Sequence, residues 1–148
     1  MGKSLSGGFY PISGVLANEE IMNVIKPGEH GSTYGGNPLA ASLGIEALKI
    51  IEDENLVKNS YKMGKYFRKE LMNLDLKNVK EIRGKGLFNA IEFNDKKNAE
   101  IILNNLKENG LLTQITKEKV LRLTPPLIIN KKQIDFSLEI LENSINWK

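Results

Sequence analysis

One lysine near the start of the chain is flanked by residues that leave its side chain room. Lys3 lies between Gly2 and Ser4, and the pair Gly7-Gly8 follows. Glycines are typical of places where the backbone turns tightly or approaches a ligand closely. An uncharged lysine amine is a nucleophile that condenses with carbonyl compounds. These residue types favour covalent chemistry at the Lys3 amine; the alternative is an ordinary solvated lysine.

A second glycine-rich segment, residues 28–38, combines hydroxyl groups with a predicted helix start. Ser32 and Thr33 supply the hydroxyls, and Asn37-Pro38 closes the segment. Asparagine is a preferred N-cap residue and proline suits the first position of a helix. Backbone N–H groups of a glycine-rich loop, hydroxyls and a helix N-terminus together favour the binding of a phosphate. A plain turn is the alternative interpretation.

An amine and a phosphate cradle in one short stretch together suggest a single cofactor. Pyridoxal 5'-phosphate is held by a lysine that bonds to its aldehyde and by groups that bind its phosphate. The two segments, spanning residues 2–8 and 28–38, therefore predict this cofactor.

The same two segments carry a resemblance to a known family. The stretches GKSLSGGFYPISGVLA and IKPGEHGSTYGGNPLAA resemble the class III (fold type I) pyridoxal-phosphate-dependent aminotransferases, and most of all the ornithine aminotransferases among them. The resemblance implies that Lys3 is the Schiff-base lysine and the catalytic residue, and that Thr33, with Ser32, contacts the cofactor phosphate. In the family this threonine serves the cofactor of the neighbouring subunit, so a homodimer with shared active sites is implied.

Arginine is scarce in this chain, which makes each of its positions informative. Only Arg68, Arg83 and Arg122 are present among 21 basic residues. A planar guanidinium suits sites that bind a carboxylate in a bidentate manner. The stretch LRLTPPL around Arg122 resembles the segment in which the family places an arginine that engages a carboxylate, of the substrate or of an enzyme glutamate. We therefore predict that Arg122 binds substrate, with a buried structural ion pair as the alternative, and that Arg83 is structural.

The chain of 148 residues is several times shorter than members of the family, whose cofactor lysine lies past the middle of the sequence. We therefore expect a C-terminal part of a larger enzyme. The expected fold is α/β: residues 1–54 as the end of the large cofactor-binding domain with an interdomain helix, and residues 55–148 as a small C-terminal α/β domain. No residue here matches the acidic and aromatic partners of the cofactor ring, so the isolated chain is expected to be inactive.

The resemblance implies transamination of ornithine with 2-oxoglutarate, which yields glutamate semialdehyde and glutamate. The substrates are thus a small amino acid and a 2-oxo acid. Another class III aminotransferase, acting on acetylornithine or 4-aminobutyrate, is the enzymatic alternative. A truncated module without catalytic activity is an alternative of a different class.

Composition excludes several other classes of protein. A net charge of +3, with 21 basic and 18 acidic residues interspersed, is typical of solvated surfaces and not of a nucleic-acid-binding stripe. Without cysteine the chain has no disulfides or thiolate metal sites, and we predict no metal ligands. No apolar run approaches the roughly 20 residues that cross a bilayer. We expect a cytoplasmic protein, or a mitochondrial one if the source is eukaryotic and a targeting segment lies upstream.

Hydrophobic spacing predicts the elements that position these residues. Helical spacing indicates helices at about 19–24, 38–53, 54–74, 96–109 and 131–146. Alternating or short apolar runs indicate strands at 9–17, 79–83, 87–93, 111–115 and 119–123. Residues 55–148 should therefore form a helix, two strands, a helix, two strands and a final helix.

Overall fold

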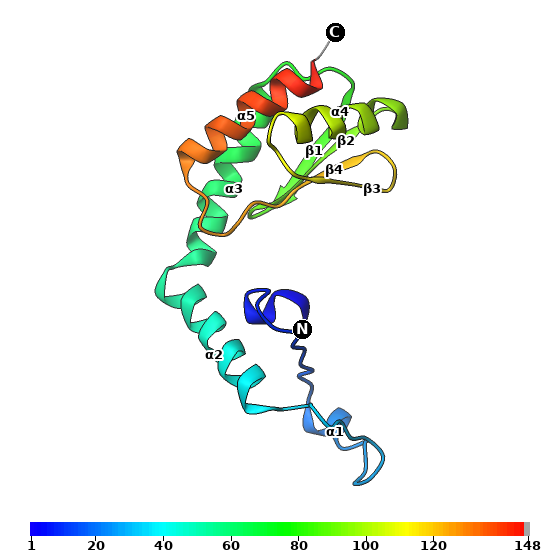
Figure 1. Ribbon diagram of the computed structural model, residues 1–148, viewed down its shortest axis with the longest axis vertical. Coiled ribbons are helices and arrows are strands. Elements are labelled where there is room, and N and C mark those ends of the chain that lie inside the picture. Colours follow the sequence, from blue (N-terminus) through cyan, green and yellow to red (C-terminus); the bar gives the residue numbers. More distant parts are fainter. Residues whose placement is uncertain (147–148) are drawn as a thin grey trace. The chain divides into compact units, whose positions relative to one another are not determined.

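A computed structural model describes residues 1–146 and divides the chain into two compact units, Met1–Glu54 (unit 1) and Asn55–Lys148 (unit 2). The elements of unit 1 are η1 (Lys3–Ser6), α1 (Glu19–Met22) and α2 (Pro38–Asp53). Those of unit 2 are α3 (Leu56–Asn73), β1 (Val79–Lys85), β2 (Phe88–Phe93), α4 (Lys96–Glu108), β3 (Gln114–Thr116), β4 (Val120–Leu123) and α5 (Lys131–Ile145). Figure 1 shows these elements along the chain. None of the helices in residues 1–146 is both long and apolar enough to cross a membrane.

Unit 2 is built on one antiparallel sheet of four strands in the order β1-β2-β4-β3. Burial alternates along β2, where Asn89, Ile91 and Phe93 are buried and Phe88 is exposed. Such alternation is typical of a sheet with one face on the core and the other facing solvent. Helices α3 and α4 pack against the sheet, and α5 packs against both of these helices (Figure 1). The opposite face of the sheet, which we call the open face, carries the side chains of alternate residues such as Phe88.

The core of unit 2 lies between the sheet and these helices. Its fully buried side chains are large and aliphatic or aromatic, and they come from every helix of the unit and from the two central strands: Phe93, Leu71, Ile91, Ile102, Leu106, Leu121, Ile134 and Leu141. Burial of this kind stabilises a fold by roughly 1.5–3 kcal/mol for each large apolar side chain. The apolar side chains of α3, α4 and α5 in this core recur at helical spacing along the sequence.

Helix α3 approaches the turn between β1 and β2 without any side chain between the two backbones. A Cβ atom added at Gly64 would lie 1.8 Å from the Gly86 carbonyl oxygen. Arg68 fixes the same turn from the next part of α3, because its Nη1 donates to the Gly86 carbonyl at 2.6 Å and to Asn89 Oδ1 at 2.5 Å. The glycine inside the helix, which lowers intrinsic helix propensity, is thus required by tertiary packing.

Unit 1 consists largely of loops around two short elements and one full helix. Its buried residues are Ser6, Ala40 and Gly44. Helix α2 begins as the sequence predicts, since Asn37 Oδ1 accepts the Ala40 N–H at 2.9 Å and Pro38 is its first residue. The turn η1 packs against α2, and Ile12 contacts the position of Gly44.

The sequence predictions for the helices and for the four strands of unit 2 are confirmed, with ends that shift by a few residues. The strand predicted at 9–17 is wrong, because this segment has no regular secondary structure. A strand needs a neighbour that satisfies its backbone groups, and among residues 1–146 no strand pairs with this one. Its large side chains remain exposed, Phe9, Val15 and Leu16 among them.

Candidate functional site

Lys3 occupies a strained backbone conformation at the start of a tight turn. Its φ angle is +54°, in the left-handed region that residues with a side chain rarely adopt. The turn η1 ends at Gly7, which is also left-handed (φ +67°) and donates its N–H to the Ser4 carbonyl at 2.9 Å. Left-handed residues other than glycine cluster at functional sites, where surrounding contacts hold them in place.

Hydrogen bonds close the segment around Lys3 into a loop. The Met1 carbonyl accepts the Gly14 N–H at 3.0 Å, and the N-terminal amine donates to the Gly14 carbonyl at 2.8 Å. Inside the loop the buried Ser6 hydroxyl accepts the Tyr10 N–H at 3.0 Å and donates to the Tyr10 carbonyl. The backbone that carries Lys3 is therefore fixed by bonds within fourteen residues of sequence.

The Lys3 side chain borders an open groove. The groove has a volume of about 390 Å³ and is lined by Lys3, Pro11, Ile12 and Ser13. Lys3 itself is exposed, so its amine is accessible to a small molecule. Neither Ser32 nor Thr33 lines this groove.

The second predicted segment forms a loop that leads into α2. Ser32 Oγ accepts the Gly35 N–H at 3.0 Å, and Asn37 Nδ2 donates to the Tyr34 carbonyl at 2.9 Å. The Ser32 hydroxyl thus shapes the turn, as serine hydroxyls commonly do. Thr33 is exposed in the same loop.

The donor set of unit 1 fits pyridoxal phosphate chemically. Lys3 supplies an exposed primary amine on a constrained turn. Ser32 and Thr33 supply hydroxyls on an exposed loop whose end is the N-terminus of a capped helix of 16 residues. Such a loop can bind an anion. The two halves lie in separate loops of this chain, so one copy does not gather them into one groove.

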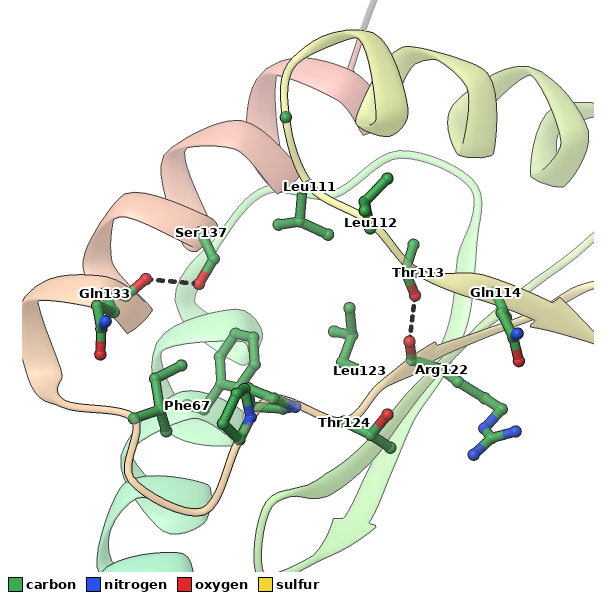
Figure 2. A pocket seen from close by; sticks show the side chains of 14 residues that line it. Phe67, Leu111, Leu112, Thr113, Gln114, Arg122, Leu123, Thr124, Gln133 and Ser137 are labelled. Carbon is green, nitrogen blue, oxygen red and sulfur yellow. Dashed lines mark hydrogen bonds between the residues drawn. The ribbon is translucent and has the colours of Figure 1, made fainter. Parts of the chain in front are cut away.

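A second hollow lies within unit 2, at the end of the β3–β4 hairpin. This cavity of about 500 Å³ is lined by strand ends, by the Pro125-Pro126 turn and by residues of α3 and α5 (Figure 2). Arg122 and Gln114 lie at one end of it, on neighbouring strands and directly opposite each other in register. The Thr113 hydroxyl donates to the Arg122 carbonyl and so ties β3 to β4 at this point (Figure 2).

The three arginines of the chain differ in what their guanidinium groups bind. Arg83 Nη1 contacts Glu81 Oε2 at 2.7 Å and Glu92 Oε2 at 2.8 Å, as the structural role predicted for it requires. Arg68 donates to the Gly86 carbonyl and Asn89 Oδ1. Arg122 has no carboxylate within 4.0 Å among residues 1–146, and its buried Nε has no hydrogen-bond partner there. The structural ion pair considered as an alternative for Arg122 is therefore absent from the described part of the chain.

On the open face, three basic side chains gather around one carboxylate, that of Glu92. Glu92 contacts Lys80 Nζ at 2.9 Å, Arg83 Nη1 at 2.8 Å and Lys119 Nζ at 3.7 Å. Hydrogen bonds from Lys80 and Arg83 lower the pKa of Glu92 from 4.5 to about 2. Arg122 takes no part in this cluster.

Two neighbours of Arg122 in the structure are not predicted from the sequence. Gln114 faces it across the β3–β4 ladder, and the Arg122 guanidinium carbon lies over the ring of Phe88 at 5.3 Å from the ring centre. The sequence could have predicted the Gln114 contact from the β3–β4 hairpin, because the register of two adjacent strands fixes which residues lie opposite each other. Phe88 comes from a different hairpin, and no local pattern predicts that contact.

Comparisons with known proteins agree on one family. The model of the family described as "Aminotransferase class-III" matches residues 1–145. "Ornithine aminotransferase" of Plasmodium falciparum is 52% identical over 99% of this chain. A solved structure of the P. falciparum ornithine delta-aminotransferase is 52% identical and has a TM-score of 0.93. The match includes 99% of this chain and 39% of the chain in that structure.

Two further relatives show the range of the likeness. "Ornithine aminotransferase, mitochondrial" of Drosophila melanogaster is 48% identical over 98% of this chain. The structure of acetylornithine aminotransferase from Elizabethkingia anophelis is 46% identical and has a TM-score of 0.89. The match includes 97% of this chain and 39% of the chain in that structure. These structures are fold type I aminotransferases, so the predicted fold class is confirmed. The chain spans about 36% of the P. falciparum relative and 34% of the Drosophila relative.

Proposed function

The chain belongs to the class III aminotransferases, and on this premise we propose that it is the C-terminal part of an ornithine aminotransferase. The complete enzyme would transfer an amino group from ornithine to 2-oxoglutarate, yielding glutamate semialdehyde and glutamate. The observation that supports this most is the 52% identity to the "Ornithine aminotransferase" of Plasmodium falciparum over 99% of this chain. Residues 1–54 are proposed as the end of the large cofactor-binding domain with the interdomain helix, and residues 55–148 as the small domain.

Class III aminotransferases depend on pyridoxal phosphate, which supplies an aldehyde that bonds to amines and a ring that accepts electrons from the substrate. Lys3 is the residue of this chain proposed to hold it covalently. When it is released by the incoming amino acid and uncharged, the amine of Lys3 would take the proton from the substrate's α-carbon and deliver it to the carbon of the cofactor that had carried the aldehyde. The exposed groove beside Lys3 leaves room for this exchange.

Ser32 and Thr33 are proposed to bind the phosphate. Their hydroxyls and the loop before α2 provide donors suited to an anion. Since neither residue borders the Lys3 groove, the proposal places them in the site of a second copy of the chain. The proposed assembly is therefore a homodimer with shared active sites, which is testable by mixing Lys3 and Thr33 variants of the complete enzyme.

Arg122 is proposed to bind a substrate carboxylate. Its guanidinium lacks a carboxylate partner in residues 1–146, in contrast to Arg83. A free, half-buried guanidinium suits a bidentate carboxylate. The substrates proposed for the site, an amino acid and a 2-oxo acid, both carry this group.

The second candidate function is transamination of acetylornithine. The 46% identity to an acetylornithine aminotransferase supports it, because identity in this part of the chain separates the two activities only weakly. The complete enzyme, assayed with ornithine and with acetylornithine as amino donors, decides between them. For the compartment we propose the cytoplasm; the Drosophila relative is named as mitochondrial, and fractionation of the source cells tests this proposal.

The covalent role of Lys3 is testable in this chain. The protein is incubated with pyridoxal phosphate, reduced with borohydride, and mapped by peptide mass spectrometry. Lys3 should carry most of the label, and Lys3→Ala should lose it together with the visible absorbance of the bound cofactor. Lys49→Ala is the matched control, because Lys49 is an exposed lysine of the same unit. Equal labelling of Lys49 and Lys3 would contradict the proposal.

We expect the chain by itself to show no steady transaminase turnover. The family's acidic and aromatic partners of the cofactor ring have no counterpart in this sequence. Purified chain is assayed with ornithine, 2-oxoglutarate and added pyridoxal phosphate. Sustained formation of glutamate would show that these partners are dispensable and would reject this expectation.

A further inference from the structure

We propose that Phe88 is a positioning residue for Arg122: its ring holds the guanidinium in place and leaves the guanidinium N–H groups free for a carboxylate. The inference rests on the proposed role of Arg122 in carboxylate binding and deepens it. Phe88 lies in β2, outside both the Lys3 segment and the Ser32–Thr33 loop.

The register of the sheet puts the two side chains on the same face. Ala90 of β2 lies opposite Arg122 of β4. Phe88 is two residues from Ala90 along β2, so it projects on the same face, since side chains alternate along a strand. The Arg122 Cζ atom lies 5.3 Å from the centre of the Phe88 ring, within the range of about 6 Å for a cation–π contact.

The kind of contact matters because it uses no N–H donor. An ion pair such as that of Arg83 with Glu81 and Glu92 occupies the donors of the guanidinium. A ring attracts the cation through its electrostatic quadrupole. Arg122 is therefore restrained by Phe88 while its Nε, which is buried, has no hydrogen-bond partner among residues 1–146.

The surroundings of Phe88 indicate that it does not serve the core. Its side chain is 62% exposed, on the open face and away from the buried cluster of unit 2. A large aromatic side chain held on a solvent-facing sheet surface gains little by burial, so the contact with Arg122 is the interaction that the structure assigns to it. Arg122, unlike Phe88, also lines the cavity of unit 2.

The test uses the 148-residue chain and the Nε–Hε signals of its three arginines in nuclear magnetic resonance. Arg122→Lys identifies the Arg122 signal. Phe88→Leu removes the ring and keeps an apolar side chain, and Phe88→Tyr restores a ring. Phe136→Leu is the matched control, because Phe136 is 64% exposed in the same unit. Two quantities are measured for each variant: the order parameter of the Arg122 Nε–Hε bond, and the dissociation constant for 2-oxoglutarate from the shift of that signal.

We expect Phe88→Leu to lower the Arg122 order parameter and to weaken 2-oxoglutarate binding about two- to fivefold, the change that a cation–π contact at an exposed site produces. Phe88→Tyr and Phe136→Leu should leave both quantities near those of the unaltered chain. An order parameter or affinity unchanged in Phe88→Leu would overturn the inference. If Phe88→Leu frees the side chain but the unaltered chain shows no response to 2-oxoglutarate, the carboxylate role of Arg122 is rejected and the contact alone remains.

Discussion

Phe9 of unit 1 and Phe93 of unit 2 are the same type of residue but differ in solvent exposure. In unit 1 the Phe9 side chain is 85% exposed, whereas in unit 2 the Phe93 side chain is completely buried. Unit 1 buries only Ser6, Ala40 and Gly44, and its conformation is set by short-range hydrogen bonds such as those of Ser6 with Tyr10. Unit 2 owes its shape to a sheet covered by α3 and α4, with α5 packed against both of these helices.

The two units also differ in what they contribute to the protein, because the candidate cofactor-binding residues and the hydrophobic core lie in different units. The candidate covalent residue and the phosphate loop lie in unit 1, while the core of the chain lies in unit 2. Large exposed apolar side chains, as in unit 1, are typical of surfaces that pack against further protein. A shared site in a dimer of the complete enzyme, as proposed above, would supply such a surface.

Replacing one phenylalanine in each unit should give the largest difference. Phe93→Ala removes a fully buried ring and should lower the free energy of unfolding by about 3–5 kcal/mol, because a cavity replaces it. Phe9→Ala should change it by less than about 0.5 kcal/mol, since an exposed side chain loses few contacts. Urea unfolding followed by circular dichroism measures both. Similar losses for the two variants would show that unit 1 contributes to the same core.

The close approach of α3 to the β1–β2 turn gives the next effect. Gly64→Ala places a Cβ atom 1.8 Å from the Gly86 carbonyl oxygen, so backbone must move, at a cost of about 1–3 kcal/mol. Gly14→Ala is the control in unit 1, where an added Cβ meets nothing within 4 Å and φ is not left-handed. Thermal unfolding of the two variants compares them. A Gly64→Ala protein as stable as the Gly14→Ala protein would contradict the packing described here.

Helix caps should have a smaller effect that again differs between the units. Asn130 and Gln133 form a reciprocal capping box at α5, with distances of 3.0 and 3.1 Å. Asn130→Ala should cost about 1 kcal/mol of unfolding free energy, measurable as a shift of the urea midpoint. Asn37→Ala removes the cap of α2, and its effect should be seen chiefly in faster amide exchange over the first turn of α2. A larger shift of the midpoint in Asn37→Ala than in Asn130→Ala would argue against this ranking.

The smallest expected effect is a dependence on pH at the open face of the sheet. The pKa of Glu92 in the folded chain is about 2, below its ordinary value of 4.5, because Lys80 and Arg83 stabilise the carboxylate. A depressed pKa contributes stability above pH 4.5, and this contribution is lost as the pH falls towards 2. Glu92→Gln should therefore be less stable than the unaltered chain at pH 7 and should converge with it near pH 2.

The control for this prediction is an exposed ion pair. Glu118→Gln removes the contact of Glu118 with Lys96, in which both side chains are exposed, and such pairs contribute little. Unfolding is measured for both variants from pH 2 to 7. A difference for Glu92→Gln that stays constant over this range would mean that its charge is not the cause.

Local sequence is sufficient for several features of both units. The pair Asn37-Pro38 predicts where α2 begins, and the apolar spacing of Ile134, Leu138 and Leu141 predicts both α5 and its buried side. The spacing also predicts four strands in unit 2. Each of these signals acts over a few residues, where the chain itself brings the interacting groups together. The strand predicted at 9–17 is wrong for the complementary reason, because strand formation depends on a distant partner.

The amino-acid sequence by itself determined the family resemblance, the candidate residues Lys3, Ser32, Thr33 and Arg122, and the order of helices and strands in unit 2. Only the tertiary structure decided that Gly64 lies against Gly86, that Arg122 lies over Phe88, and that the groove beside Lys3 excludes the Ser32–Thr33 loop. The physical reason is distance along the chain. Caps and turns form between near neighbours, whereas contacts between strands and helices depend on how the buried side chains of the whole unit pack together.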